Sequence, residues 1–419
     1  MSGPISRVVV LMMENHSFDH LLGWLPGIGR LNEQCSNPLD PGDPASERVP
    51  VSRGAEFRTD PCPDHGLADV NIQIFGTEVP EKEQLPSMEG FVSNYVSPRP
   101  EKNRKPGDAK TLMGCYSPEQ LPVIATLAKE FVVCTHWFAS VPGPTGPNRL
   151  FVNCATSGGY AGDAWYQGQA ELPAKLATET LFERLSKHDR SWGLYYEDFA
   201  TELCLDVLRS PRFEGCRHAS LCDFFWDLEK DQLPDYCFLT PRLIETAPLA
   251  RPGCRFPMNK GECCLCQTGN SMHSPDDVRH GEELIARVYE AIRAKPSVWE
   301  NTLLIVTWDE HGGFYDSASP PMEVASPDGL GYEQAPGFDF TRLGVRVPAL
   351  LISTWTDAAI DETVYEHASI PATVIKLFGL GEPLTARDAA AATFEHHFNR
   401  SQPRDDNAKI ARPAWPPKD

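Results

Sequence analysis

Continuous runs of apolar residues recur along the chain, and their lengths match those of buried strands. Polar residues do not alternate with apolar ones in these runs, a pattern typical of strands that are covered on both faces in a parallel or mixed sheet. The runs that predict strands are Arg7 to Met13, Phe131 to Cys134, Trp192 to Tyr196, Tyr236 to Leu239, Thr302 to Thr307 and Val345 to Ile352.

Helical periodicity separates several of these runs. From Asp277 to Lys295 apolar residues recur every three to four positions, and Asp276 and Asp277 are suitable caps for the start of this helix. A second helix is expected from Ser369, as its N-cap, to Phe378. Strands that alternate with helices predict an α/β fold with a mostly parallel sheet between helices.

Long stretches rich in proline and glycine lie between these elements, at residues 37–52, 97–107 and 319–337. Loops of this length in a compact domain usually form binding walls or lids. We expect a single catalytic domain over residues 1–400. The proline-rich segment 401–419 is expected to be a loose C-terminal tail.

Charge and hydropathy narrow the classes of partner. The net charge of −20 argues against binding to DNA or RNA, and an anionic substrate would need a bound cation or a focused basic cluster. No run approaches the roughly 20 apolar residues of a transmembrane segment, and none resembles a signal peptide. This predicts a protein of the cytoplasm or of a membrane surface. The 13 cysteines keep a secreted mature form open.

The spacing of the cysteines does not define a disulfide framework. Their number is odd, so at least one thiol stays unpaired in a monomer. A dense patch is compatible with disulfides or free thiols, which we favour, or with a small zinc site. It consists of Cys254, Cys263, Cys264 and Cys266.

Polar residues follow directly after two of the predicted strands. Glu14 and Asn15 end the first strand, and Asp309 and Glu310 end the strand that begins at Thr302. Ligands gather at the carboxyl ends of strands in open α/β sheets, and adjacent buried carboxylates need a cation or hydrogen-bond donors. The alternatives are a helix cap in the first segment and an exposed acidic turn in the second.

These four side chains offer oxygen ligands without thiolates. Such a set favours Mg²⁺, Ca²⁺ or Mn²⁺, and nearby histidines keep Zn²⁺ or Fe possible. The glycines after His311 allow the chain to turn sharply beside a ligand.

A third segment, Val141 to Arg149, holds Thr145 in a loop with three prolines. A hydroxyl in a rigid loop suits a metal-activated nucleophile, while Arg149 and Asn148 are suited to binding phosphate oxygens. As an isolated pattern this loop is weak evidence for a catalytic residue, because most threonines are structural. Two loop histidines, His65 and His273, are candidates for protonating a leaving group, although a lone loop histidine is more often a surface residue.

In this order, the segments resemble the phosphoesterase family that holds bacterial phospholipases C and metal-dependent acid phosphatases, most closely the plant non-specific phospholipases C. The resemblance covers nearly the whole chain. The matching motifs are Glu14 to His20, Thr145 with Pro147 to Val152, Asp309 to Phe314, Gly344 to Pro348, Glu366 to Thr373 and Leu384 to Asp388.

This resemblance implies an alkaline-phosphatase-like core and a catalytic centre with assigned roles. It implies that Thr145 attacks phosphorus and that His65 and His273 are active-site histidines. His311 is a further candidate for substrate binding, beside Asn148 and Arg149. The metal ligands that the resemblance implies are Glu14, Asn15, Thr145, Asp309 and Glu310.

The chain departs from the family pattern at three places. Thr135 stands where relatives usually have an aspartate, and Asp276 stands where a second histidine is common. The sequence also ends soon after the core, so we expect no long C-terminal extension like that of the plant enzymes, which is associated with lipid engagement.

We therefore expect a metal-dependent phosphoesterase, first of all a phospholipase C that hydrolyses a glycerophospholipid at a membrane surface to diacylglycerol and a phosphorylated head group. The alternative enzyme is a phosphomonoesterase of the acid phosphatase type. The alternative from another class is a non-catalytic lipid- or metal-binding protein.

Overall fold

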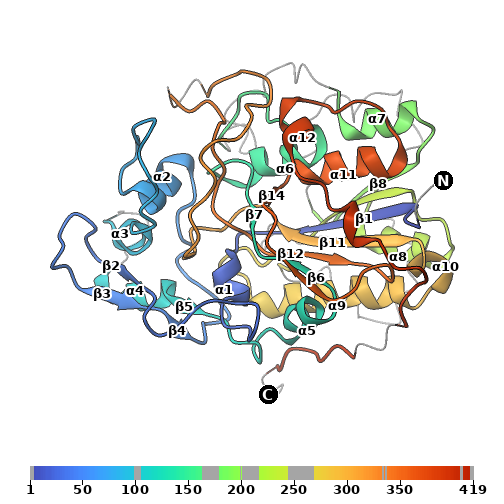
Figure 1. Cartoon of the computed structure of the whole chain (residues 1–419). Coiled ribbons are helices and arrows are strands. Elements are labelled where there is room, and N and C mark those ends of the chain that lie inside the picture. The colour runs from blue at the N-terminus through green and yellow to red at the C-terminus, as the bar shows by residue number, and fades with distance from the viewer. Residues whose placement is uncertain are drawn as a thin grey trace.

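The centre of the protein is an eight-stranded sheet between two layers of helices (Figure 1). The computed structural model describes residues 4–98, 105–162, 179–198, 200, 217–243, 269–332, 335, 337–405 and 409–415. The strands are, in spatial order, β13 (Ala359–Asp361), β6 (Val132–Cys134), β12 (Ala349–Ile352), β11 (Thr302–Trp308), β1 (Arg7–Met13), β10 (Tyr236–Thr240), β8 (Trp192–Tyr196) and β9 (Arg217–Ala219).

All neighbouring strands run parallel except where β12 pairs antiparallel with β11 and with β6. The predicted α/β class with a mostly parallel sheet is confirmed. β1 and β11 lie at its centre, and both are fully buried along their apolar runs because helices cover both faces. Their register pairs Met13 with Trp308, so the two strands end side by side.

The helices divide between the two faces of the sheet, as Figure 1 shows. One layer contains α5 (Pro122–Glu130), α8 (Leu221–Glu229), α9 (Val278–Arg293) and α10 (Pro296–Trp299). The other contains α6 (Thr145–Cys154), α7 (Leu181–Lys187), α11 (Ser369–Phe378) and α12 (Ala386–Ala390). None of the helices in the described ranges has the length and apolar composition to cross a membrane.

A long excursion of the chain between β1 and α5 lies beyond the carboxyl end of β1 (Figure 1). It has a small apolar core, which includes Phe91 and Leu112 and is completed by Phe314 from the segment after β11. Its elements are α1 (Phe18–Leu22), β2 (Ser36–Pro38), β3 (Arg48–Pro50), β4 (Ser52–Arg53), α2 (Leu67–Phe75), α3 (Phe91–Val96), η1 (Pro106–Asp108), α4 (Ala109–Leu112) and β5 (Gly114–Cys115). The excursion thus forms a wall beside the strand ends.

The predicted strand Val345 to Ile352 is too long at its start. Only Ala349–Ile352 joins the sheet, because Pro348 has no N–H to donate to a ladder. Val347 N instead donates to Trp137 O (2.8 Å), and Ala139 N donates to Val345 O (3.2 Å). This segment runs beside β7 (Trp137–Phe138), which itself pairs with β14 (Tyr365–Glu366).

Two further expectations about local structure need correction. Asp277 caps α9 as expected, whereas Ala368 is the N-cap of α11, and Ser369 is its first residue. The Ser369 hydroxyl accepts a hydrogen bond from Glu366 N (3.2 Å) and so closes the preceding turn instead. The loop expected at residues 37–52 contains the antiparallel pair of β2 and β3.

The segment after Arg400 packs against the body of the protein where it is described. Arg404 N donates to Thr354 O (2.7 Å), and its guanidinium lies 4.7 Å from the centre of the Phe131 ring. Further along, Arg279 Nη1 donates to Ala414 O (3.0 Å). Segment 401–419, which we expected to be a loose tail, therefore makes specific contacts with the body of the protein where it is described.

The cysteine patch from Cys254 to Cys266 lies outside the described residues. Within them, Cys115 and Cys134 are buried unpaired thiols, in line with the odd number of cysteines.

Candidate active site

The two strand ends that carry the candidate metal ligands meet at the carboxyl edge of the sheet. Asp309 N donates to Met13 O (3.2 Å), and Asn15 N donates back to Asp309 Oδ1 (3.0 Å). Glu14 is 2% exposed and Asp309 is fully buried. The segment at Asp309 is therefore not an exposed acidic turn. Nor does Glu14 cap the next helix, because the N-cap of α1 is Ser17.

Sharp backbone turns bring these segments together. Asn15 has a positive φ of 56°, a conformation that asparagine tolerates better than most residues, and His16 N donates to Glu310 O (3.0 Å). Gly312 also has a positive φ, and a Cβ there would lie 2.2 Å from Asn15 O. A side chain at position 312 would push the two ligand segments apart.

Thr145 lies beside Glu14, but it is not in a loop. It is the first residue of α6, so Asn148 and Arg149 lie on a helix as well, which corrects the predicted loop. Thr145 Oγ1 donates to Glu14 Oε2 at 3.5 Å. The helix N-terminus carries a partial positive charge, which favours an anion and stabilises an ionised hydroxyl at this position.

Asn148 and Arg149 both bind protein groups in this structure. The Asn148 side chain accepts from Val141 N (2.9 Å) and donates to the carbonyls of Val141, Gly143 and Pro144. These bonds fix the chain that leads into Thr145. The geometry gives Asn148 a positioning role.

Arg149 lies between the two strand ends. Its Nη2 donates to Glu14 Oε1 (2.9 Å), its Nε lies 3.3 Å from Asp309 Oδ2, and Nη2 also reaches Met12 O (3.1 Å). Burial and the charge of Asp309 nevertheless raise the pKa of Glu14 well above its usual value, against the effect of Arg149. One guanidinium thus does not balance the buried carboxylates.

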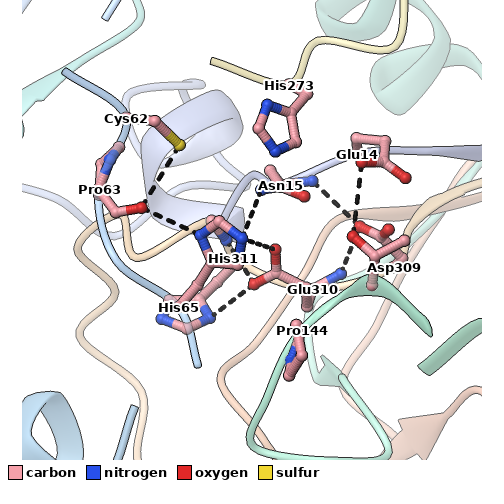
Figure 2. Close-up of polar contacts among 12 residues, drawn as sticks. Glu14, Asn15, Cys62, Pro63, His65, Pro144, His273, Asp309, Glu310 and His311 are labelled. Atoms are coloured by element: carbon pink, nitrogen blue, oxygen red, sulfur yellow. Dashed lines mark hydrogen bonds and ion pairs between the residues drawn. The ribbon is translucent and has the colours of Figure 1, made fainter. Parts of the chain in front are cut away.

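His65 and His273 reach the same place from two loops, and Figure 2 shows their rings beside Asn15 and Glu310. His65 Nε2 lies 3.3 Å from Asn15 Nδ2 and 3.9 Å from Glu310 Oε1. The His65 and His273 rings are 5.9 Å apart, edge to face. The structure brings both candidate histidines to the predicted metal ligands.

His311 is buried and faces protein atoms. Its Nε2 lies 2.7 Å from Gln73 Oε1, and its Nδ1 lies 3.4 Å from Glu310 Oε2. Burial, followed by the proximity of His65, lowers the pKa of His311 to about 3, so the ring is neutral at physiological pH. In this geometry His311 positions Glu310.

His367, for which the sequence predicts no role, lies in a segment that matches a family motif. His367 Nε2 lies 2.6 Å from Asp309 O, and Trp137 Nε1 donates to His367 Nδ1 (3.2 Å). His367 N also donates to Ser140 Oγ (3.1 Å). The ring therefore braces the Asp309 backbone, a role that depends on long-range packing and leaves no local sequence signal.

The donor set fits a divalent cation in chemistry and charge. Glu14, Asp309 and Glu310 with Arg149 leave two negative charges, and the buried Asn15 Oδ1 has no hydrogen-bond partner among the described residues. The carboxylates do not yet converge, since Arg149 separates Glu14 from Asp309. In the described part of the chain, only Asp361, His396 and His397 place three possible His, Cys, Asp or Glu ligand atoms within 4.8 Å of one another.

A cavity of about 720 Å³ lies near the loop that leads into α6, and its lining residues do not include Thr145. A Cβ on Gly143 would lie 3.1 Å from Ala161 O and 3.9 Å from Leu67 N, and both Leu67 and Ala161 line this cavity. Apolar and polar residues share its walls. The apolar ones include Ala68, Phe75, Val79, Pro80, Met322 and Phe338, and the charged ones are Glu78, Glu81, Lys82, Asp339 and Arg342.

The departures from the family pattern have definite surroundings. Thr135 N donates to Asp361 O (2.8 Å), and the Thr135 hydroxyl lies 3.1 Å from His136 Nδ1. Asp276 N donates to His273 O (2.8 Å), so this residue lies next to a candidate catalytic histidine.

Comparison with known proteins is consistent with this geometry. The model of the Phosphoesterase family matches residues 5–381. Non-specific phospholipase C6 of Arabidopsis thaliana is 38% identical over 410 residues, which cover 94% of this chain and 72% of that protein. Non-specific phospholipase C1 of the same plant is 38% identical over 420 residues, covering 96% and 73%.

A bacterial relative and a solved structure extend the comparison. Phospholipase C B of Mycobacterium tuberculosis is 26% identical over 451 residues, covering 95% of this chain and 78% of that protein. A protein of the alkaline phosphatase superfamily from Vibrio parahaemolyticus has a TM-score of 0.37 and 11% identity, covering 63% of this chain and 62% of that one. The extent of the family match and of the plant similarity establishes that this chain belongs to the phosphoesterase family and is a phosphoric ester hydrolase.

Proposed function

We propose that this protein is a metal-dependent phospholipase C with Thr145 as its nucleophile. The observation that carries the proposal is the position of the Thr145 hydroxyl, 3.5 Å from Glu14 Oε2 at the positive end of α6. Two adjacent strand ends supply carboxylates at the same place. Relatives that match over nearly the whole chain are named phospholipases C.

The residues that would hold the metal are Glu14, Asn15, Thr145, Asp309 and Glu310. A bound divalent ion would lower the pKa of the hydroxyl and offset negative charge that develops on the phosphoryl group. Oxygen ligands favour Mg²⁺, Ca²⁺ or Mn²⁺, and the nearby His65 and His273 keep Zn²⁺ or Fe as candidates.

The reaction would take place in two displacements. Thr145 loses its hydroxyl proton to solvent, and its Oγ forms a bond to phosphorus as the bond from phosphorus to the glycerol oxygen breaks. His65 or His273 gives a proton to that leaving oxygen. Water then cleaves the phosphothreonine and releases the phosphorylated head group. Arg149, held by Glu14 and the Met12 carbonyl, would contribute positive charge near the phosphoryl oxygens.

The cavity beside α6 supports a substrate with apolar chains. Its lining residues Leu67 and Ala161 lie next to Gly143, two residues before the nucleophile, and its volume of about 720 Å³ is within the range of ligand pockets. Val79, on its wall, is 75% exposed, and Leu85 on the same loop is 82% exposed. We propose that these residues enter the surface of an aggregated lipid. The net charge of −20 favours zwitterionic over anionic head groups.

The test is a comparison of substrates with a matched set of variants. Wild-type protein is assayed with phosphatidylcholine in mixed micelles, followed by quantification of diacylglycerol and phosphocholine, and with a soluble aryl phosphate monoester. Thr145→Ala should lose at least roughly 1,000-fold in turnover, whereas Thr145→Ser should retain measurable activity. Circular dichroism and thermal unfolding check that both variants are folded.

Three outcomes would contradict parts of this proposal. Full activity of Thr145→Ala would remove Thr145 from the nucleophile role. Phosphate release from the monoester without any diacylglycerol would identify a phosphomonoesterase of the acid phosphatase type. An absence of turnover with Mg²⁺, Ca²⁺, Mn²⁺, Zn²⁺ and Fe²⁺ alike would favour a non-catalytic binding protein.

A further inference from the structure

A second group of potential metal ligands lies at the outer edge of the central sheet. Asp361 ends β13, the outermost strand, and His396 and His397 belong to the short helix η6 (Glu395–His397). β13 is three strands away from β11, which at about 4.8 Å per strand puts Asp361 roughly 14 Å from the strand that carries Asp309. The group is therefore separate from the catalytic centre.

The ligand atoms of this group are already close together. His397 Nε2 lies 2.6 Å and His396 Nε2 lies 3.8 Å from Asp361 Oδ2, and the three atoms all lie within 4.8 Å of one another. Nitrogen and oxygen ligands at about 2.0–2.1 Å from a tetrahedral zinc ion are roughly 3.3 Å apart. A cation would thus need only small side-chain adjustments, and the His396 side chain, 54% exposed, is free to make them.

Neighbouring groups contact two of the three ligands, Asp361 and His396. Asp361 Oδ1 accepts from Thr363 N (2.8 Å), and Asp361 Oδ2 accepts from the Tyr365 hydroxyl (2.8 Å). His396 Nδ1 lies 3.2 Å from Thr393 O, which places its proton on Nδ1 and leaves the Nε2 lone pair for a cation. Such outer contacts accompany nearly all histidine ligands in metal sites.

The group is open on one side, since the His396 side chain is 54% exposed while those of His397 and Asp361 are 15% and 7% exposed. Solvent can therefore reach the ligand atoms from the side of His396.

We infer that Asp361, His396 and His397 form a second cation site, selective for Zn²⁺ or a similar transition metal. Two imidazole nitrogens and one carboxylate oxygen suit such ions, whereas Mg²⁺ and Ca²⁺ require oxygen ligands. The bound ion ties the segment after α12 to the edge strand β13. Covering an exposed edge strand protects it from pairing with other chains.

The experiment compares wild-type protein with His396→Ala and with the control His188→Ala. His188, the C-cap of α7, is also exposed, and it lies far from η6 in sequence. His396→Ala removes one ligand while the bond between His397 and Asp361 stays in place, so the fold should persist. Each protein is stripped with chelator, equilibrated with Zn²⁺ and analysed for bound zinc per chain.

Wild-type protein and His188→Ala should each bind one more zinc ion per chain than His396→Ala, whose affinity at this site should fall at least about 100-fold. Zn²⁺ should raise the melting temperature of the first two proteins more than that of His396→Ala, and Mg²⁺ should produce no such difference. The variant Glu14→Gln, changed in the catalytic centre, should keep this zinc ion. Equal zinc content and equal thermal shifts in wild type and His396→Ala would overturn the proposal.

Discussion

Two buried clusters in this protein are built from the same parts, two carboxylates and one arginine. In the first, Arg149 joins Glu14 and Asp309; in the second, Arg346 joins Asp19 and Asp316 through contacts of 2.9 and 3.1 Å. Both arginines are almost completely inaccessible to solvent. Composition alone therefore does not distinguish a candidate catalytic cluster from a structural one.

Hydrogen bonding distinguishes them. In the Arg346 cluster the carboxylate oxygens accept further bonds, from Ser317 N to Asp19 (2.8 Å) and from Ala318 N to Asp316 (2.9 Å). Asp316 also accepts from Asp19 N (3.0 Å). Saturated carboxylates of this kind serve the fold.

In the Arg149 cluster Asp309 Oδ1 likewise accepts from Asn15 N (3.0 Å) and Glu310 N (2.7 Å), but the hydrogen bonding at Glu14 and beside it is less complete. Glu14 Oε2 has a contact of 3.5 Å with Thr145, and the buried Asn15 Oδ1 has no hydrogen-bond partner within the described ranges. Such oxygens are costly to bury without a cation. Incomplete hydrogen bonding at a buried carboxylate cluster is thus the feature that points to ligand binding.

The largest expected difference between the clusters concerns charge at Glu14. Glu14→Gln keeps the shape of the side chain but removes one negative charge and should reduce kcat/KM on the order of 1,000-fold. In chelator its unfolding free energy should be unchanged or raised by roughly 1 kcal/mol, because repulsion from Asp309 is relieved. Kinetics, metal titration and chemical denaturation measure the three quantities. A large loss of stability with normal activity would make this cluster structural.

The converse result is expected for Arg346. Arg346→Met leaves Asp19 and Asp316 buried without their cation and should lower the unfolding free energy by about 3–5 kcal/mol. Activity per folded molecule should remain near that of wild type, measured at a temperature where urea titration shows the variant to be folded. If activity disappears while stability is retained, the two clusters do not divide the roles as described.

A third buried carboxylate, that of Glu282, has no arginine among its hydrogen-bond partners in the described part of the chain and so provides a comparison for the two clusters. Glu282 accepts hydrogen bonds from Val123 N (2.7 Å) and Ile124 N (2.9 Å) at the start of α5 instead of from a guanidinium. Burial, opposed by these two bonds, raises its pKa from 4.5 to about 8.

Between pH 4.5 and 8 the folded state therefore holds a proton that the unfolded state has released. The contribution of Glu282 to stability should fall as pH rises through this window, by roughly 3 kcal/mol or more in total. Glu282→Gln should flatten that part of the pH dependence of unfolding, measured by urea titration at successive pH values. Parallel curves for the two proteins would show that Glu282 is charged throughout.

The smallest expected effect concerns the contact between the His367 ring and the backbone carbonyl of Asp309. His367→Leu removes the contact to Asp309 O and should reduce metal affinity and kcat/KM by about 10- to 100-fold. His367→Gln retains a donor near the position of Nε2 and should recover part of this loss. Equal activity of the two variants would mean that His367 acts only through packing.

The sequence predicts the strands that carry this chemistry well, because β1 and β11 are apolar on both faces and end abruptly in carboxylates. It also predicts the proximity of Glu14 and Asp309, since parallel strands share a carboxyl edge. Family resemblance was needed to assign Thr145, His65 and His273 to the site, because no local pattern relates three segments far apart in the chain.

Other features depend on packing that a single sequence does not display. Asparagine and arginine side chains are suited to binding phosphate, yet the hydrogen-bond partners of Asn148 and Arg149 are set by how α6 packs on β1. The brace from His367 requires the long-range contact of two segments 58 residues apart. The predicted strand from Val345 to Ile352 is wrong over its first residues, because apolar residues also pack outside a sheet. Val345 packs in this way against the excursion.

The attachment of Arg149 has a practical consequence for protein engineering. This side chain fastens α6 to the Met12 and Met13 carbonyls one turn after Thr145, so the nucleophile and the central strand form one inflexible unit. Randomising residues within that turn should yield mostly inactive libraries. Selections for new substrates are better directed at the walls around Leu67 and Val79, where changes in shape leave the attacking group in place.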